Sequence, residues 1–232
     1  MIAALFVRRD SIYKSIPSID AYDMDRRAET FRGGCPVIAH PPCRTWSKLK
    51  AFARAPVGEH NLALFAVDLV RENGGVVEHP ATSSLWSVSG MPLLGGLPDK
   101  WGGWVFECDQ FHWGHLAQKR TRLYICGTFF LPPIPHKDGI PSHCVSSLTG
   151  KRRSVAERRS LPHYKPELGP NRRDRTPLEF ALWLKEICES ISCGADGREA
   201  RTDPGVYRFK EEDIILFNRF GVHKDNNSRR EP

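Results

Sequence analysis

Short apolar stretches recur along the first 130 residues and alternate with polar or helix-forming segments. They cover residues 3–7, 19–22, 37–39, 75–78 and 123–126. Runs of this length, rich in Val, Ile and aromatic residues, are typical of buried strands, and their alternation with helices is typical of a wound α/β sheet. We therefore predict an α/β fold with a mostly parallel sheet and helices on both faces.

Two segments show the spacing of amphipathic helices. Residues 61–73 place apolar side chains three or four positions apart, and two glycines follow. This pattern predicts a helix that crosses back to a parallel strand. Residues 176–188 carry a second apolar side, for which we predict Thr176 as N-cap and Pro177 as the first helical residue.

Composition narrows the classes of function. With 34 Lys and Arg against 27 Asp and Glu, the 232-residue chain has a formal charge of +7, which favours a polyanionic substrate. Its apolar runs are far shorter than the roughly 18 residues of a membrane span, and residues 2–7 are too short for a secretory signal. Seven cysteines without paired spacing indicate reduced thiols. We expect a cytoplasmic protein that does not bind membranes.

The texture of the sequence predicts four regions. Residues 1–130 form the catalytic core, and residues 131–175, rich in proline and basic clusters, form a loop-rich basic insertion. Residues 176–193 form a closing helix that packs back on the core. Residues 194–232 form a polar tail.

The sharpest local motif follows the strand predicted at residues 37–39. There His40-Pro41-Pro42-Cys43 places a thiol beyond the carboxyl end of a strand, where groups line the ligand crevice of an open α/β sheet. Two prolines would hold the thiol on a fixed backbone, as a nucleophile requires. The alternative is a buried structural cysteine.

Two further motifs lie at strand ends. Glu78 ends the next predicted strand and would face the same crevice, although such a residue is more often a surface acid or helix cap. Gln118, Arg120 and Arg122 alternate ahead of the last strand, so we predict that they share one face suited to anions or to orienting a loop. A solvated strand edge is the alternative for these three.

In this order and spacing, the three motifs resemble the C5-cytosine DNA methyltransferase family over residues 18–127. Pro42-Cys43 resembles its Pro-Cys loop, and Glu78-His79-Pro80 resembles its Glu-Asn-Val. Gln118, Arg120 and Arg122 match its Gln-x-Arg-x-Arg without a change. The resemblance implies a Rossmann-like methyltransferase fold with a short basic insertion.

The resemblance also implies a mechanism and its catalytic residues. The thiolate of Cys43 would add to carbon 6 of cytosine, so that carbon 5 becomes able to attack a one-carbon donor. Glu78 would protonate or hydrogen-bond nitrogen 3, while Arg122 and Arg120 would orient the base. A base in a duplex must be flipped out for this chemistry, or arrive single-stranded or as a nucleotide.

The same resemblance implies partners. S-adenosylmethionine would be the donor, with Phe6, Asp23 and Thr176 as its contacts, and Asp23 would hold the ribose. DNA would be the substrate, and a homodimer is left open. The residues implied for substrate binding are Pro42, Ser47, Gln118, Arg152 and Arg153.

The sequence departs from the family at the donor turn, where Arg8-Arg9-Asp10 replaces glycines that let the backbone approach the cofactor. Two solutions stay open. S-adenosylmethionine binds in a rearranged pose, still held by Asp23, or the arginines hold an anionic donor such as methylenetetrahydrofolate. A free cytosine nucleotide as substrate and an inactive DNA-binding relative are further alternatives.

Two other groups of residues favour packing over chemistry. Cys108, His112 and His115 have a spacing compatible with metal ligands, but no fourth partner is evident, so we predict no metal. The aromatic residues are expected in the core, with base stacking as the alternative. They are Trp101, Trp104, Phe106, Phe111 and Trp113.

Overall fold

The computed structural model describes residues 1–47, 50–145 and 155–191. Its centre is a six-stranded sheet of order β2-β1-β3-β4-β7-β5. The strands are β1 (Ile2–Leu5), β2 (Ile19–Tyr22), β3 (Val37–Ala39), β4 (Gly75–Pro80), β5 (Trp104–Asp109) and β7 (Arg120–Cys126). All five predicted strands are present, within a few residues of their expected bounds.

The sheet is mixed. Strands β1 to β4 pair in parallel, whereas β7 is antiparallel to both β4 and β5. Strand β5 therefore runs in the same direction as β4, and β7 alone opposes the rest. The prediction of a mostly parallel sheet is confirmed, and β5, which the sequence pattern did not reveal, is added to it.

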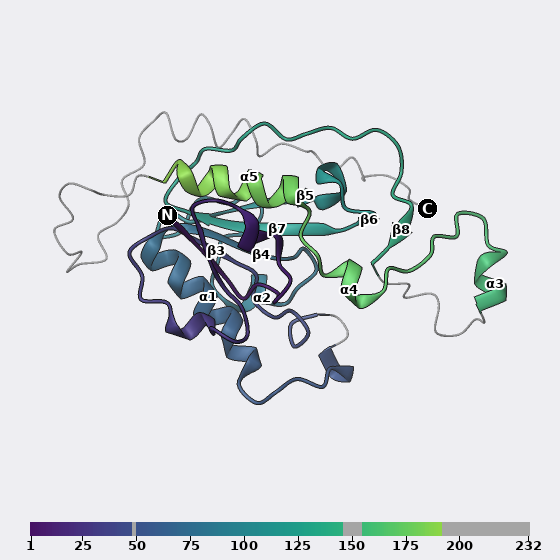
Figure 1. The fold of residues 1–232 in the computed structure, drawn as a ribbon, viewed down its shortest axis with the longest axis horizontal. Helices are drawn as coiled ribbons and strands as arrows, with labels where there is room; N and C mark the ends of the chain where they lie inside the picture. The colour runs from purple at the N-terminus through teal and green to yellow at the C-terminus, as the bar shows by residue number, and fades with distance from the viewer. Residues whose placement is uncertain (48–49, 146–154, 192–232) are drawn as a thin grey trace, which may run out of the picture.

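Helices cover both faces of the sheet, as predicted (Figure 1). On one face, α1 (Glu59–Asn73) packs its buried Ala63, Ala66 and Val70 against inward side chains of β1, β3 and β4. On the other face, α5 (Leu178–Glu189) buries Phe180, Leu184 and Ile187. Successive strand residues alternate between these two cores because side chains of a strand point to opposite faces.

The turn between α1 and β4 requires glycine. Gly74 caps the helix with φ of 76°, and Gly75 opens the strand with φ of 132°. A Cβ on Gly75 would lie 2.0 Å from the carbonyl oxygen of Val37. The two predicted glycines therefore let the helix end and β4 approach β3 closely.

The beginning of α5 differs from its prediction. The helix starts at Leu178 and Pro177 is its N-cap residue, with no side-chain hydrogen bond to the helix. Thr176 therefore does not cap the helix. The prediction was one residue early because Pro177 has an extended ψ of 145°, whereas a first helical residue has helical ψ.

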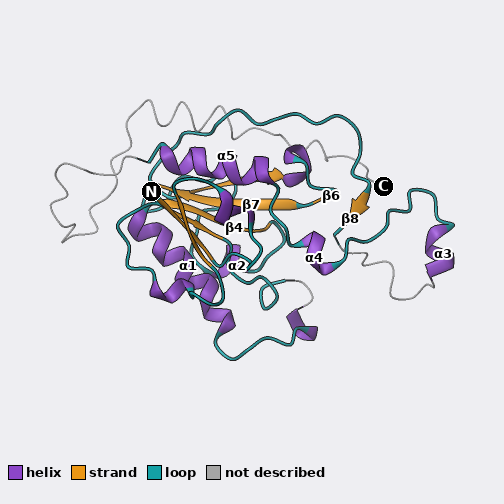
Figure 2. Ribbon diagram, viewed as in Figure 1, coloured by secondary structure: helices purple, strands orange, loops and turns teal. Residues whose placement is uncertain are grey.

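Residues 131–175 contain few regular elements among those described (Figure 2). Strand β8 (His143–Cys144) pairs with β6 (Ala117–Gln118), and the helices α3 (Val155–Arg159) and α4 (Pro170–Arg173) are short. The other short elements are α2 (Leu85–Val88) and the 3-10 turns η1 (Ile12–Ser15), η2 (Ala28–Thr30), η3 (Lys50–Phe52) and η4 (Gln110–Trp113).

Several predictions fall outside the described residues. Arg152, Arg153 and the polar tail from residue 194 onward are among them. Within the part of the chain that the structure describes, no helix is long and apolar enough to cross a membrane.

Candidate functional site

The carboxylate of Glu78 lies at the centre of a buried polar cluster at the end of β4. Its Oε1 accepts hydrogen bonds from Gln110 Nε2 at 3.0 Å and Thr121 Oγ1 at 3.1 Å. Its Oε2 is 3.0 Å from His40 Nδ1. An ionised carboxylate can only accept, so the ring nitrogen Nδ1 carries the hydrogen in this contact. Three donors from three other segments thus fix the position of this acid.

His40 connects Glu78 to a second buried group. Its Nε2 is 2.9 Å from the hydroxyl of Tyr13, which is completely buried under α5. Burial holds the pKa of Tyr13 well above its usual value, with the charge of Glu78 adding to the effect. Tyr13, His40 and Glu78 therefore form a continuous chain of hydrogen bonds across the carboxyl ends of β3 and β4.

The electrostatics of this cluster keep Glu78 ionised. Burial alone would raise the pKa of the carboxyl group, but the hydrogen bond from His40 and attraction to Lys119 hold it well below the usual value. His79 itself is fully buried on the opposite face, and burial lowers its pKa to about 4. Its ring is therefore neutral at pH 7.

Cys43 lies in the loop that crosses over this edge of the sheet. His40 begins the loop on the α5 face, and Trp46 ends it in the core under α1. The Cys43 side chain is exposed, yet the surrounding protein desolvates the thiol enough to raise its pKa. The charges of Glu78 and Asp174 raise it further, and Lys119 opposes them. Cys43 and Glu78 are thus close enough for the charge of Glu78 to act on the thiol.

The two predicted arginines have a different neighbour. Arg122 Nε donates to Glu107 Oε2 at 2.7 Å, and Arg120 pairs with the same carboxylate. In the register of the sheet, Arg122 lies opposite His79, whereas Glu78 lies opposite Leu123. Glu78 therefore projects toward the α5 side and Arg122 toward the α1 side. The structure does not bring the two side chains together on one face.

Gln118 does not continue the alternation of the two arginines. It belongs to β6 and pairs with Cys144 of β8, so it lies in a different sheet from Arg120 and Arg122. The prediction that all three share one strand face is wrong, because the chain leaves β6 before β7 begins.

Sequence patterns missed most of the polar cluster. Tyr13 and Gln110 lie in 3-10 turns, which have no periodic pattern. Thr121, between the two arginines, is buried and was not predicted to belong to the site. The alternation of side chains along a strand could have identified Thr121. It lies between Arg120 and Arg122, so its side chain must point to the opposite face from theirs. His40 belongs to the motif that contains Cys43, but no role for its ring was predicted from the sequence.

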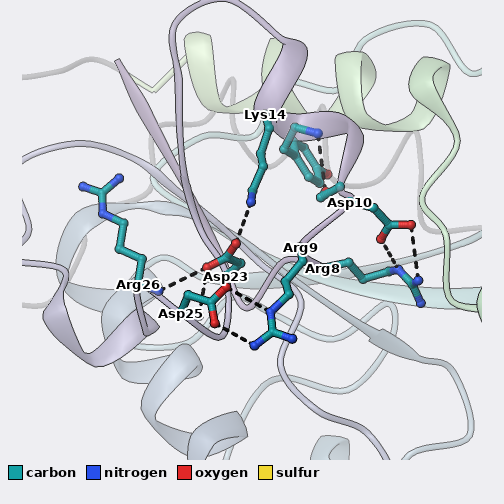
Figure 3. Close-up of polar contacts among 9 residues, drawn as sticks. Arg8, Arg9, Asp10, Lys14, Asp23, Asp25 and Arg26 are labelled. Atoms are coloured by element: carbon teal, nitrogen blue, oxygen red, sulfur yellow. Dashed lines mark hydrogen bonds and ion pairs between the residues drawn. The ribbon is translucent and has the colours of Figure 1, made fainter.

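The edge formed by β1 and β2 holds a separate network of ion pairs (Figure 3). Asp23 follows β2 directly, and its Oδ2 lies 2.6 Å from Lys14 Nζ. Its Oδ1 accepts from the backbone N–H groups of Asp25 and Arg26 at 2.9 and 3.1 Å. The hydrogen bond from Lys14, together with these backbone donors, lowers the pKa of Asp23 to about 2. Both oxygens are thus engaged by the protein.

The two arginines in the loop after β1 are also paired. Arg9 makes two hydrogen bonds to Asp25, at 2.7 and 2.9 Å. Asp10 accepts from Arg8 at 2.8 Å and from Arg175 at 2.9 Å. Asp10 therefore ties the loop after β1 to the segment that precedes α5.

These contacts test whether the edge fits S-adenosylmethionine in the expected pose. Asp23 would have to release Lys14 or its backbone donors to hold a ribose, and the side chains of Arg8 and Arg9 occupy the turn where glycines are needed. Phe6 does lie at the end of β1, with φ of 60°, but its ring packs against the core under α1. The residues present do not fit that pose.

The remaining predicted residues are dispersed. Thr176 lines a hollow of about 330 Å³ together with His115, Asn171, Arg172 and Arg175. Pro42 and Ser47 flank Cys43 in its loop and are partly buried.

The possible metal ligands and the aromatic residues occupy structural positions. His115 Nδ1 accepts from the backbone N–H of Ala117, its Nε2 faces the carbonyl of Arg173, and Cys108 packs beside the α5 core. Among the described residues, no group of three or more His, Cys, Asp or Glu side chains could hold a metal ion. Trp104, Phe111 and Trp113 are buried, as expected of core residues.

Comparison of the sequence with models of known protein families and with curated proteins found no match.

Proposed function

We propose that this protein activates carbon 5 of cytosine for one-carbon transfer, through a covalent adduct between Cys43 and carbon 6. The observation that supports this is the exposed thiol of Cys43 in a proline-held loop, within electrostatic range of the buried, ionised Glu78. The proposal extends the mixed α/β architecture to a Rossmann-like methyltransferase fold, as the resemblance implies.

The proposed steps concern the base and the protein's own residues. The Cys43 thiol loses its proton to solvent, and its sulfur forms a bond to carbon 6. The electron pair of the C5–C6 double bond then forms a C4–C5 double bond, and the C4–N3 pair moves to N3, which takes up a proton delivered by way of the Glu78 carboxylate. Carbon 5 is now an enamine carbon that attacks an electrophile. Arg122 and Arg120 are proposed to orient the base from the α1 side.

DNA is the proposed carrier of the cytosine. The net charge of +7 and the basic clusters of residues 151–175 favour a polyanion. The misfit at Asp23 leaves the donor outside the mechanism, and S-adenosylmethionine and methylenetetrahydrofolate are both tested below.

Hydrogen exchange at carbon 5 tests the proposal without any donor. In deuterated water, the enamine takes a deuteron at carbon 5, loses the original proton and expels the thiolate, so the base returns labelled. Mass spectrometry should detect label in single-stranded or duplex DNA incubated with the wild-type protein.

Parallel incubations with deoxycytidine monophosphate separate the substrates. Labelling of the nucleotide alone would overturn the DNA assignment and favour a nucleotide-modifying enzyme. DNA binding without labelling of either substrate would favour an inactive DNA-binding relative.

A further inference from the structure

The hydrogen-bonded chain from Tyr13 through His40 to Glu78 has an arrangement that a purely structural cluster does not require. Gln110 and Thr121 already satisfy one oxygen of Glu78. The other oxygen meets a histidine, the side chain whose ordinary titration lies nearest to neutral pH. That histidine has a second buried partner on its far nitrogen, so its ring is oriented at both ends.

The proposed reaction requires a proton at N3 of cytosine, which an ionised Glu78 alone cannot supply. N3 of neutral cytosine is a hydrogen-bond acceptor, and so is an ionised carboxylate, so the two repel unless a proton lies between them. The surroundings of Glu78 favour its ionised form. The proton that N3 receives must therefore come through Glu78 from a neighbour.

We propose that His40 is the positioning residue that supplies Glu78 with the proton that passes to N3. This inference rests on the proposed function. The transfer starts from a His40 ring with a hydrogen on each nitrogen. The Nδ1 proton passes to the Glu78 carboxylate, Glu78 then gives it to N3, and the neutral ring keeps its hydrogen on Nε2, where the Tyr13 oxygen accepts it. No co-reactant is needed, since one N–H bond breaks and another forms, and the proton returns when the adduct collapses.

The groups around this chain are compatible with the transfer. Lys119 and the neutral His79 act on Glu78 from the β6–β7 connection and from the far face of β4. On β5, the pKa of the Cys108 thiol is raised by burial, and the charge of Glu78 acts on this thiol and on that of Cys43. Of these side chains, His40 is the one hydrogen-bonded to Oε2.

The test compares the pH dependence of carbon-5 exchange in wild type and His40→Asn. The asparagine amide can still donate to Glu78 but has no proton to transfer. We expect the exchange rate to fall by about 10² or more near neutral pH. The high-pH limb of the profile, which reports loss of the proton from the His40–Glu78 pair, should move to lower pH because Glu78 must then be protonated directly by solvent.

His136→Asn is the matched control, since His136 is exposed, pairs with the nearby Asp138 and stacks on His112, away from Glu78. It should leave rate and profile unchanged. Tyr13→Phe removes the partner of Nε2 and should slow exchange less than His40→Asn. A lower rate in His40→Asn with an unmoved high-pH limb would show that His40 only holds Glu78 in place, and would overturn the inference.

A measurement on the free protein separates this inference from the proposed function. Nuclear magnetic resonance should show a hydrogen-bonded ring proton on His40 Nδ1 that is lost in Glu78→Gln. If this proton is absent, the inference fails whether or not the protein is active. If it is present while wild type shows no exchange on any cytosine substrate, the proposed function fails and the proton's role with it.

Discussion

The carboxyl edge of the sheet contains two acidic centres that are built in opposite ways. At the β3–β4 side, Glu78 is held by a histidine, an amide and a hydroxyl, none of which is a permanent cation. At the β1–β2 side, Asp23 is held by a lysine and by two backbone N–H groups. Both carboxyl groups have lowered pKa values, but the causes differ.

The difference separates a site that can move protons from one that fixes a turn. The partners of Glu78 can reorient or exchange protons, so the acid can serve a substrate without losing its place. Backbone donors cannot leave Asp23 unless residues 23–26 rearrange. The exposed pairs beside it, such as Arg9 with Asp25, contribute little stability each, about 0–1 kcal/mol.

The largest expected loss of activity comes from a substitution of Cys43, beside the Glu78 centre. Cys43→Ala should abolish carbon-5 exchange, because no other nucleophile in the loop can form the adduct. Its free energy of unfolding should change by no more than about 0.5 kcal/mol, since the side chain is exposed. Cys35→Ala, at the opposite end of β3, is the control and should retain activity. Exchange at the wild-type rate without Cys43 would end the covalent mechanism.

Glu78→Gln should reduce the rate constant for exchange by about 10² to 10⁴ and change KM little. The proton to N3 is needed mainly in the transition state, so the ground-state complex is less affected. Steady-state kinetics on DNA would show the split, with Glu72→Gln on the exposed side of α1 as control. A change confined to KM would make Glu78 a binding residue and would remove the contrast with Asp23.

The sequence predicted the strands that carry Glu78 and Asp23 better than the hydrogen-bond partners of these two acids. Apolar runs predicted five of the strands, because burial on both faces demands them. Glu78 was predicted as the last residue of its strand, but β4 continues to Pro80. Strand β5 was missed because its alternating Trp104, Phe106 and Cys108 were considered as isolated aromatic or metal-binding candidates. Hydrogen-bond partners could not be predicted, since Gln110 and Tyr13 reach Glu78 and His40 from short turns that leave no periodic signal.

Salt dependence tests whether the paired arginines are free to bind phosphate. Neutralising Arg152, Arg153, Arg158 and Arg159 together should flatten the slope of log affinity against log salt by up to about 0.9 per lost phosphate contact. Arg9→Gln should change it less, because Arg9 already pairs with Asp25. Fluorescence anisotropy on a short duplex at several salt concentrations measures both slopes. A larger effect of Arg9 would make the β1–β2 edge a DNA surface.

Acid unfolding tests the role assigned to Asp23. Its pKa is lowered to about 2 in the folded protein, against an ordinary value of 3.8, so folding gains stability from it above pH 3.8. That contribution is lost as pH falls from 3.8 toward 2. Asp23→Asn should therefore flatten the fall of unfolding free energy in this window by up to one proton. Denaturant titrations between pH 2 and 6 measure it, and an unchanged slope would mean that the Lys14 pair does not form.

Donor binding should show the smallest effect, and it decides between the alternatives left open by the sequence. Because Lys14 and the backbone already engage Asp23, Asp23→Ala should leave the affinity for S-adenosylmethionine unchanged wherever that donor binds. Calorimetry with S-adenosylmethionine and with methylenetetrahydrofolate, on wild type and on this variant, makes the test, and Asp68→Ala on α1 controls for loss of a surface charge. Strong weakening of S-adenosylmethionine binding by Asp23→Ala alone would show that the ion pair opens to admit a ribose. Binding of the folate alone would instead make the product a hydroxymethylated or related base, since that donor delivers its carbon at the oxidation level of formaldehyde.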